Sequence, residues 1–325
     1  GGNGYLGWPM SMNLSKQGHK IYVVDNLSKE KIIKNCGILS LNKVYSINEK
    51  VQKWNKNYNN KIEFFENDLL DFDFLSNLLE KIKPDTIIHF AEQPSAPYSM
   101  MNRDAAVFTQ QNNIIGTLNL LFAIKEKSKN SHLIKLGSMG EYGTPNIDIE
   151  EGWIEINHKN RKEKVFFPKK PNSFYHLSKV HDSYNINFAS RIWGLKITDL
   201  NQGVVYGLDT PETKLDEYFT TPFYYDHIFG TVINRMILQA AMNDDLTVYG
   251  SGKHKRTFIN INNTIECINL AINNPPENEK FEVYNQFTEV FSILEIASNI
   301  SNAAKNLSLN PKIQFIKNPR IEDDE

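Results

Sequence analysis

Tyr175 and Lys179 are the two residues whose types and spacing most directly suggest chemistry. They stand four apart at the start of a helical pattern that runs to about Trp193, so on a helix they share one face. An ammonium beside a phenol favours the phenolate and lowers the pKa of the tyrosine. Such a pair can take a proton from a sugar hydroxyl as hydride leaves the same carbon. The structural alternative is a half-buried ring beside a solvated charge.

The first residues of the chain have the spacing of a phosphate-binding turn. Gly1, Gly4 and Gly7 precede a helical pattern, and the apolar strand that follows ends at Asp25. In a dinucleotide-binding fold such glycines allow a tight turn, the helix N-terminus binds pyrophosphate, and the acid binds ribose hydroxyls. The layout therefore predicts bound NAD, and Asp25 disfavours NADP because it would repel the additional phosphate. A glycine-rich turn that only packs would not explain Asp25.

Strands and helices then alternate along the chain. Strands are expected at 20–25, 63–66, 85–90, 132–136 and 196–200, and helices at 71–81, 104–127 and about 172–193. This order predicts an α/β fold with a Rossmann-like, doubly wound parallel sheet. Ligands bind at the carboxyl ends of such strands, where Asp25, Asp68, Ala91 and Ser138 fall. Asp68 is equally well explained as a residue near a helix N-cap.

Two domains are expected. Residues 1–200 form the NAD-binding domain, with a hairpin or lid inserted at about 145–171. Residues 201–325 form a smaller α/β region that mainly binds the substrate and is interleaved with the end of the sheet. The strand that should precede Gly1 is missing, so we expect the sheet to lack its first strand, and we interpret the chain as a fragment trimmed at both ends.

Composition sets further bounds. The chain has 325 residues and a net charge of −2, which gives no reason to expect a nucleic-acid partner. Its two cysteines, Cys36 and Cys267, indicate a reducing compartment without a disulfide framework. No apolar run is long enough to span a membrane, no targeting peptide is visible, and no metal site is expected.

Longer motifs resemble those of the extended short-chain dehydrogenase/reductases. That resemblance rests on the glycine loop, Asp25, Asn113, Ser138 and Tyr175-x-x-x-Lys179. Within this group the chain resembles most closely the UDP-sulfoquinovose synthases, over nearly its whole length. The closer resemblance rests on Gly7-Trp8, Gln93 with 95–100, 137–152, 173–182, 199–207 and 285–289.

The closer resemblance implies a reaction between UDP-glucose and sulfite. C4 of the glucose is oxidised by bound NAD, which acidifies the C5 proton, and water is then lost across C5 and C6. Sulfite adds to the resulting enone, and hydride returns to C4. The product, UDP-sulfoquinovose, is the head-group donor for sulfolipid, and the cofactor is recycled without net redox change.

The resemblance also implies roles for individual residues. Tyr175 is the base at the C4 hydroxyl, Lys179 tunes it and binds the nicotinamide ribose, and Ser138 hydrogen-bonds the same hydroxyl where the family usually has Thr. Ser138 has an alternative interpretation as a small residue that caps a turn. The cofactor-binding residues implied are Gly1, Gly4, Tyr5, Gly7, Asp25, Asn26, Asp68, Leu69, Ala91, Asn113, Tyr175, Lys179 and Val205.

His176 is the candidate for the elimination step. Sugar 4,6-dehydratases have an Asp-Glu pair directly after the Ser or Thr, and these two positions are Met139 and Gly140 here. Another group must then move the protons at C5 and O6, and His176 titrates near neutral pH. Met139 and Gly140 would also leave room for sulfite at C6. The alternative is a structural histidine on the helix.

For the substrate, the resemblance implies the following contacts: Ser138, Gln202, Thr231, Asn234, Tyr249, Arg256 and Arg320. Guanidinium groups suit a diphosphate, although each arginine alone could be a surface charge. Two departures from the family pattern stand out. Pro94 replaces an arginine expected to touch the substrate, which puts a contact to the sugar or to sulfite in doubt, and Lys29 replaces another arginine.

Two alternatives to this reaction stay open. One is another NAD-dependent UDP-sugar epimerase or dehydratase, and the other is a non-catalytic scaffold that binds NAD and a nucleotide sugar. The resemblance implies a homodimer paired through two long helices. It leaves open whether a partner protein delivers sulfite. The compartment would be the cytoplasm for a bacterial source or the plastid stroma for an algal one.

Overall fold

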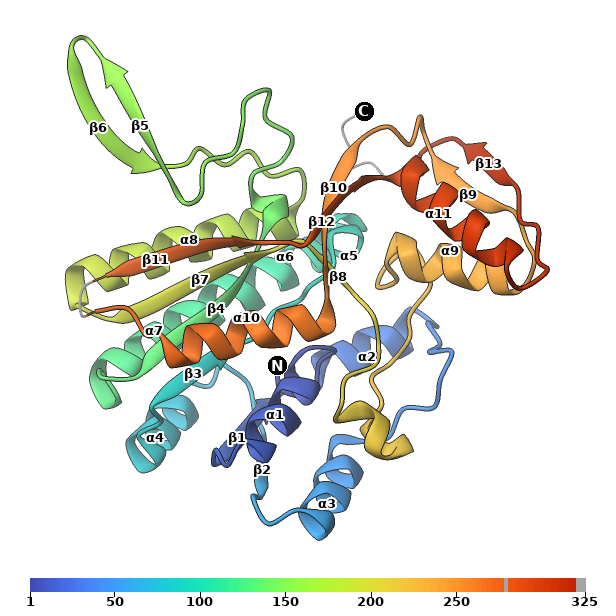
Figure 1. Ribbon diagram of the computed structural model, residues 1–325. Helices are drawn as coiled ribbons and strands as arrows, with labels where there is room; N and C mark the ends of the chain where they lie inside the picture. Colours follow the sequence, from blue (N-terminus) through green and yellow to red (C-terminus); the bar gives the residue numbers. More distant parts are fainter. Residues whose placement is uncertain (278–279, 320–325) are drawn as a thin grey trace. The chain divides into compact units, whose positions relative to one another are not determined.

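The computed structural model describes residues 1–277 and 280–319 and divides the chain into two compact units (Figure 1). Unit 1 comprises Gly1, Asn67–Gly203 and Glu266–Gln286. Unit 2 comprises Gly2–Glu66, Val204–Ile265 and the described residues from Phe287 onward. The units interleave in the sequence, and the domain boundary predicted near residue 200 remains a prediction.

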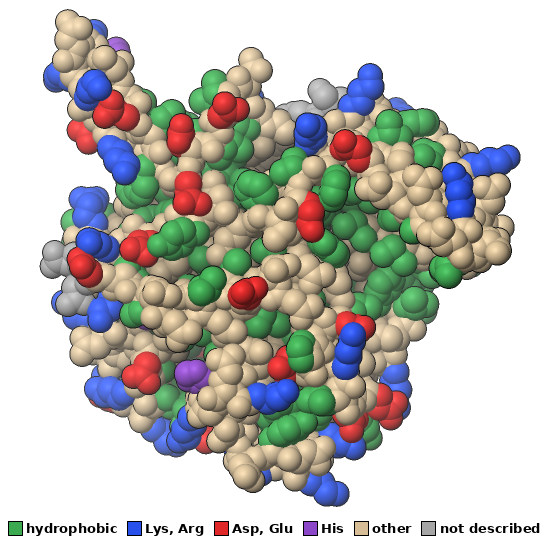
Figure 2. Space-filling view, viewed as in Figure 1, with side chains coloured by type: hydrophobic (Ala, Val, Ile, Leu, Met, Phe, Trp, Pro, Cys, Tyr) green, Lys and Arg blue, Asp and Glu red, His purple; other side chains and the backbone are tan. Residues whose placement is uncertain are grey.

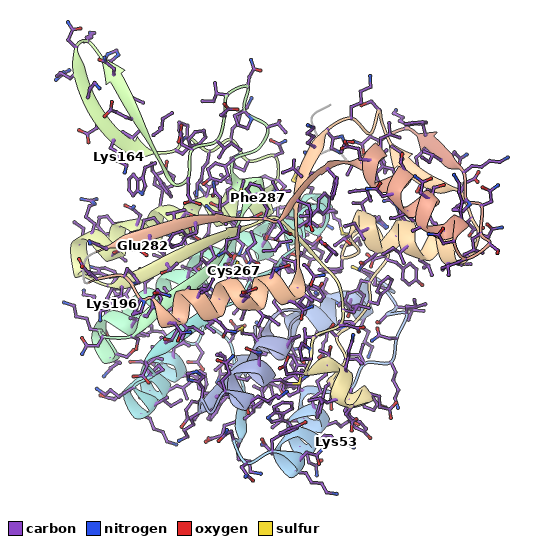
Figure 3. The ribbon with its side chains drawn as sticks, in the orientation of Figure 1. Lys53, Lys164, Lys196, Cys267, Glu282 and Phe287 are labelled. Atoms are coloured by element: carbon purple, nitrogen blue, oxygen red, sulfur yellow. The ribbon has the colours of Figure 1, made fainter. Side chains whose placement is uncertain are left out.

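Unit 1 is built on a four-stranded parallel sheet. Its strands, in spatial order, are β11 (Phe281–Gln286), β7 (Lys196–Gln202), β4 (His132–Ser138) and β3 (Thr86–His89). Ser138 pairs with Gln202, and Gln202 with Gln286, so these three residues lie together at the carboxyl ends of their strands. Lys196 and Glu282, both labelled in Figure 3, lie near the amino ends of β7 and β11, respectively.

Some helices of unit 1 pack on this sheet, and others pack on those helices. They are α4 (Phe72–Ile82), α5 (Ala96–Met100), α6 (Arg103–Gln110), α7 (Gly116–Lys127) and α8 (Phe174–Trp193). Apolar side chains of α4, α7 and α8 pack with Leu133 of β4 and Ile197 of β7 in one buried core. Near-continuous apolar runs are expected in parallel strands that are covered by helices. The predicted strand–helix alternation and the α/β class are confirmed.

The helix predicted at 104–127 is not continuous. A π-helical turn, η1 (Gln111–Ile115), separates α6 from α7. Such wide turns are rare, frequently occur at functional sites, and have no simple sequence signature. The turn contains Asn113, whose side chain is fully buried.

The segment expected to form a hairpin or lid contains an antiparallel hairpin. Its strands are β5 (Trp153–His158) and β6 (Arg161–Phe166), and the turn uses Lys159 and Asn160 at positive φ. The hairpin projects from unit 1 beyond α8 (Figure 1), and it carries charged side chains of both signs (Figure 2).

Unit 2 contains the glycine loop and a short parallel pair of strands. The helix α1 (Gly7–Lys16) is followed by β1 (Ile21–Asp25), which pairs with β2 (Ile62–Glu66). Between these strands lie α2 (Ser28–Asn35) and α3 (Ile47–Asn57). Trp8, Met12, Val23, Trp54 and Phe219 form part of the core here.

The remainder of unit 2 has two further small sheets. One joins β12 (Glu289–Ser292), β10 (Lys255–Asn260) and β8 (Val204–Tyr206), and the other joins β13 (Ile313–Ile316) and β9 (Leu246–Tyr249). Helices α9 (Val232–Ala241) and α11 (Ile293–Lys305) pack on them around Met236 and Phe258. Helix α10 (Ile261–Asn273) begins in unit 2 and ends in unit 1.

Among the strands that the structure describes, β1 and β3 each have a single partner strand. Within the described residues, β1 pairs only with β2, β3 pairs only with β4, and no strand pairs with both β1 and β3. No helix in the described part of the chain has both the length and the apolar character needed to cross a membrane.

Candidate active site

Two serine side chains fix the start of α8. Ser173 is the N-cap, and its Oγ accepts a hydrogen bond from the backbone N–H of His176 at 3.1 Å. The Oγ of Ser99 accepts a hydrogen bond from the backbone N–H of Tyr175 at 3.0 Å. N–H groups in the first turn of a helix have no partner within that helix, so these bonds set where α8 begins. The motif around Ser99 therefore supports the helix that carries Tyr175.

Tyr175 and Lys179 lie on one face of α8, as their spacing predicts. The Nζ of Lys179 lies 5.8 Å from the centre of the Tyr175 ring. Burial raises the pKa of Tyr175 above its ordinary value of 10.0; Lys179 lowers this pKa and Glu92 raises it. The ammonium acts in the predicted direction, but burial outweighs it. The expectation of a lowered pKa is therefore not met by these protein groups alone.

Lys179 has a buried anionic partner that the sequence reasoning did not single out. Its Nζ donates to the carbonyl oxygen of Leu136 at 2.6 Å and lies 2.6 Å from Oε2 of Glu92. The side chains of Lys179 and Glu92 are only 6% and 3% exposed. The available signal was the position of Glu92 just after the strand at 85–90, where ligand-binding residues of parallel sheets gather.

Ser138 lies in a tight turn at the end of β4. Its Oγ accepts a hydrogen bond from the backbone N–H of Gly140, and its own N–H donates to Oε1 of Glu141, both at 3.1 Å. The two bonds form a capping box for the 3₁₀ turn η2 (Met139–Glu141). Ser138 thus caps a turn, as the alternative interpretation predicted. This does not exclude the catalytic interpretation, because a hydroxyl has both a donor and acceptor sites.

Glu141 anchors this turn in a buried ionic cluster. Its Oε1 lies 3.4 Å from Nζ of Lys135, and its Oε2 lies 2.5 Å from Nζ of Lys169. The Oγ of Ser183 lies 2.9 Å from Oε2 of Glu141 and 2.7 Å from Oδ2 of Asp199, and its hydroxyl can donate to either carboxylate. Burial raises the pKa of Glu141, but Lys135 and Lys169 lower it more and hold it well below its usual range. Sequence reasoning missed this cluster, because its members come from separate elements.

His176 lies directly against the backbone of Gly140. A Cβ added at Gly140 would overlap Nε2 of His176, while Nδ1 of the same ring lies 3.0 Å from Oγ of Ser173. Gly140 does not have a positive φ, so its lack of a side chain is needed for space rather than for backbone conformation. The space that a side chain at position 140 would take is thus occupied by an imidazole.

Asn113 connects the π-helical turn to the loop after β3 and to α8. Its Oδ1 accepts from the backbone N–H of Gln93 at 2.8 Å, and its Nδ2 donates to Oγ of Ser178 at 2.8 Å. Gln93 in turn donates to Thr109 at 2.8 Å. Asn113 therefore positions the loop after β3 and the first turns of α8 relative to each other, whatever else it binds.

Other predicted cofactor-binding residues of unit 1 border the strand ends. A Cβ added at Gly1 would overlap the backbone at Phe90 and Ala91. Asp68 accepts a hydrogen bond from the backbone N–H of Leu70 at 2.9 Å, within the turn before α4. The carbonyl oxygen of Leu69 accepts from Asn119 at 2.9 Å.

In unit 2 the carboxylate of Asp25 is held close to the glycine loop. Its Oδ2 accepts from the backbone N–H of Asn3, and its Oδ1 from that of Leu27, both at 2.9 Å. Asn26 accepts from Ser28 at 3.0 Å, and the hydroxyl of Tyr5 donates to the carbonyl oxygen of Gly207. Gly4 and Gly7 lie in the turn that leads into α1 and at its first residue. Asp25 is thus fixed in orientation at the end of β1.

The predicted nucleotide-sugar residues of unit 2 lie around α9 and β9. Thr231 is the N-cap of α9 and accepts from the N–H of Asn234 at 3.2 Å, while Nδ2 of Asn234 donates to the carbonyl oxygen of Tyr224 at 2.9 Å. The ring of Tyr249 lies 4.0 Å from the guanidinium of Arg235, which sequence reasoning missed.

Of the remaining residues predicted to bind substrate or cofactor, three lie on strands and one lies outside the residues that the structure describes. Val205 lies in β8 and Arg256 in β10. In unit 1, Gln202 donates to Gln286 at 3.2 Å. Arg320 lies outside the described residues.

Comparison with known proteins identifies the family. The model of the NAD-dependent epimerase/dehydratase family matches residues 1–285. The chain belongs to this family. It is 48% identical over 325 residues to a chloroplastic UDP-sulfoquinovose synthase from Spinacia oleracea, covering 100% of this chain and 67% of the relative. It is 39% identical over 324 residues to a UDP-sulfoquinovose synthase from Sulfolobus acidocaldarius, covering 99% and 82%. The resemblance expected from the motifs is confirmed.

Solved structures share the fold of this chain. A UDP-glucuronic acid 4-epimerase from Bacillus cereus, solved with UDP-glucuronic acid and NAD, aligns with a TM-score of 0.70 at 21% identity. The alignment covers 97% of this chain and 84% of that one. The Rossmann-like fold class is thereby confirmed.

The glycine loop of this family member fits an NAD cofactor. Added Cβ atoms at Gly1 and Gly2 would overlap the backbone at Phe90 and the side chain of Val23, respectively. The loop therefore requires residues without side chains at these positions. Such a bare backbone, followed by the N-terminus of α1, suits a pyrophosphate, and Asp25 suits ribose hydroxyls.

Proposed function

We propose that this family member converts UDP-glucose and sulfite to UDP-sulfoquinovose and thereby serves sulfolipid synthesis. The observation that carries the proposal is the identity, over essentially the whole chain, to two relatives named UDP-sulfoquinovose synthase. When bound, NAD supplies hydride transfer from and back to C4 of the sugar, so it is recycled.

The chemistry at C4 is assigned to three residues of unit 1. Tyr175 takes the proton of the C4 hydroxyl and later returns it. Lys179 holds a positive charge next to the phenol and binds the nicotinamide ribose. Ser138 hydrogen-bonds the same sugar hydroxyl. The geometry supports this assignment because Tyr175 and Lys179 share one face of α8, and Ser138 lies at the carboxyl end of β4.

The elimination of water is assigned to His176. A C4 ketone acidifies the C5 proton, and a base must remove that proton while an acid protonates O6. The Oγ of Ser173, 3.0 Å from Nδ1 of His176, can donate to or accept from this nitrogen, so it stabilises either tautomer. Nε2 of the neutral ring can therefore take the C5 proton, and the imidazolium formed can then give a proton to O6.

The position of His176 supports this role. Its Nε2 fills the space beside Gly140, where the dehydratase pattern has a carboxylate. No carboxylate stands at Met139 or Gly140 to move the protons. We propose that the imidazole takes over this task; the space beside Gly140 that was expected to admit sulfite holds this ring instead.

The remaining ligand-binding roles are proposed residue by residue. For NAD, Gly4, Tyr5, Gly7, Asp25, Asn26 and Val205 are assigned in unit 2, and Gly1, Asp68, Leu69, Ala91 and Asn113 in unit 1. For the UDP-sugar, we assign Gln202, Thr231, Asn234, Tyr249, Arg256 and Arg320. Tyr249 offers an aromatic face, and the polar side chains and guanidinium groups suit the base and the diphosphate.

Two further proposals concern partners and compartment. Large apolar side chains are exposed on the helices around the site, which supports a homodimer paired through them: Val107, Ile115, Phe122, Phe188 and Ile192. A protein that delivers sulfite is a proposed partner. The plastid stroma is proposed for an algal source, in line with the chloroplastic name of the spinach relative, and the cytoplasm for a bacterial one.

One experiment tests the function. The purified protein is incubated with UDP-glucose, NAD and sulfite, and the product is analysed by mass spectrometry. A UDP-sulfonosugar is expected. A UDP-4-epimer or a 4-keto-6-deoxy sugar would indicate an epimerase or dehydratase, and recovery of unchanged UDP-glucose would indicate a non-catalytic binding protein, as Pro94 in place of the family's arginine would suggest.

A further inference from the structure

Glu92 is a buried carboxylate that contacts the lysine of the proposed catalytic pair. Its Oε2 lies 2.6 Å from Nζ of Lys179, and its Oε1 lies 3.8 Å from Nε2 of His89. All three side chains are almost fully buried. Burial and the nearby lysines lower the pKa of His89 well below its usual value. His89 is therefore neutral, and Lys179 is the cation that compensates Glu92.

The ammonium of Lys179 is held from two sides. Besides Glu92, it donates a hydrogen bond of 2.6 Å to the carbonyl oxygen of Leu136, the third-last residue of β4. Glu92 follows β3 and Leu136 belongs to the neighbouring strand, so two adjacent strands fix the position of Nζ. A flexible lysine side chain is thereby held at one point relative to Tyr175 on its own helix.

Several charged groups surround Tyr175. Lys179 and Lys135 lower the pKa of its hydroxyl, and Glu92 and Glu141 raise it. The ring of His176 lies 4.9 Å from the Tyr175 ring, centre to centre. In a buried site with a low local dielectric, such charges act strongly over a few ångströms. Removing the charge of Glu92 would leave the effect of Lys179 less opposed.

We propose that Glu92 is a positioning residue that sets the basicity of Tyr175 through Lys179. It holds the ammonium in place and offsets part of its positive charge at the phenol. Tyr175 must take a proton from the C4 hydroxyl and later return it, so its basicity affects both steps. Lys179 without a counter-ion would make Tyr175 a weaker base. This inference rests on the proposed role of Tyr175.

Asp182 is a second buried carboxylate that could compensate for the loss of the Glu92 charge. It lies three residues after Lys179 on α8 and is fully buried. Burial raises its pKa well above the usual value, and the negative charge of Glu92 raises it further. When Glu92 is neutralised, Asp182 can ionise and replace the lost charge. A test therefore needs Glu92→Gln both alone and combined with Asp182→Asn.

The test is a titration of Tyr175 in the full chain without substrate. Tyrosine rings are labelled with ¹³C, the Tyr175 signal is assigned by comparison with Tyr175→Phe, and its shift is followed against pH by NMR. The Tyr175 titration should move to lower pH by about one unit or more, a tenfold change in the acid constant. We expect this shift in Glu92→Gln or, if Asp182 compensates there, in Glu92→Gln/Asp182→Asn. Glu92→Asp should stay close to the wild type.

Controls separate this idea from the proposed reaction. Glu80→Gln removes an exposed carboxylate of α4 and should leave the Tyr175 titration unchanged. The titration needs no turnover, so it is informative even if the substrate differs from the one proposed. If Tyr175 titrates at the wild-type pH in both the single and the double variant, Glu92 does not set its basicity. With turnover, the acidic limb of the pH–kcat profile should shift to lower pH in Glu92→Gln.

Discussion

The imidazole of His176 occupies the space that a side chain at Gly140 would need. These two residues come from α8 and from the turn after β4, and the sequence separates them by a long hairpin segment. The proposed acid–base group therefore belongs to the same helix as Tyr175, whereas the dehydratase pattern has carboxylates on the turn.

Replacing His176 with Ala should stop the elimination but not the oxidation at C4. With UDP-glucose, enzyme-bound NADH should still form, because Tyr175 and Lys179 are unchanged. Exchange of the C5 hydrogen with solvent deuterium should fall by about a hundredfold to ten-thousandfold, which is the usual contribution of a general base. Mass spectrometry and NMR of the recovered sugar measure the exchange. Exchange at the wild-type rate would mean that the base is another group.

Replacing Gly140 with Ala should produce a similar defect by displacing the imidazole. The backbone at Gly140 tolerates alanine, since its φ is not positive, so the clash with His176 is the main perturbation. C5 exchange should drop while NADH formation persists. In the His176→Ala background the same change should have little further effect, because the two residues are in contact. An additive loss in the double variant would contradict the steric explanation.

Replacing Tyr175 with Phe should prevent the first step. The variant lacks the hydroxyl that accepts the C4 proton, so UDP-glucose should yield no NADH absorbance, and C5 exchange should also be absent. The backbone bond from residue 175 to Ser99 is kept, so the folded structure should persist in circular dichroism. NADH formation by this variant at the wild-type rate would remove Tyr175 from the proposed role.

Asp25 should determine the choice of cofactor. Its carboxylate is fixed by the N–H groups of Asn3 and Leu27, and NAD should bind much more tightly than NADP, whose phosphate it would repel. Asp25→Asn keeps an acceptor oxygen but loses the charge, so the ratio of the two affinities should fall. Calorimetric titration with both cofactors measures this ratio. Equal affinities for the wild-type chain would exclude Asp25 from this role.

Lys135 should contribute strongly to stability. Its Nζ lies 3.4 Å from Glu141 and 3.6 Å from Asp199, and all three side chains are fully buried. Lys135→Met would leave both carboxylates less compensated and should lower the free energy of unfolding by about 3–5 kcal/mol. Urea denaturation measures it. Lys162→Met, which breaks the exposed pair with Glu155 in the hairpin, is the matched control and should leave the midpoint nearly unchanged.

The sequence by itself determined the features that depend on local spacing. Tyr175 and Lys179 share a helix face because residues four apart always do so on an α-helix. The glycine loop, Asp25 at the end of a strand, and the alternation of strands and helices are likewise local patterns. The hairpin segment could also be predicted, because charged residues and turn formers interrupt the apolar periodicity there.

Only the tertiary structure decided which charges meet in the interior. Glu92 reaches Lys179, and Lys169 at the end of the hairpin segment reaches Glu141, across long separations in the sequence. The π-helical turn that holds Asn113 has no local signature either. The net effect on the pKa of Tyr175 depends on burial and on four charged neighbours at once. Such sums require the distances between elements, and a linear pattern of residues does not contain them.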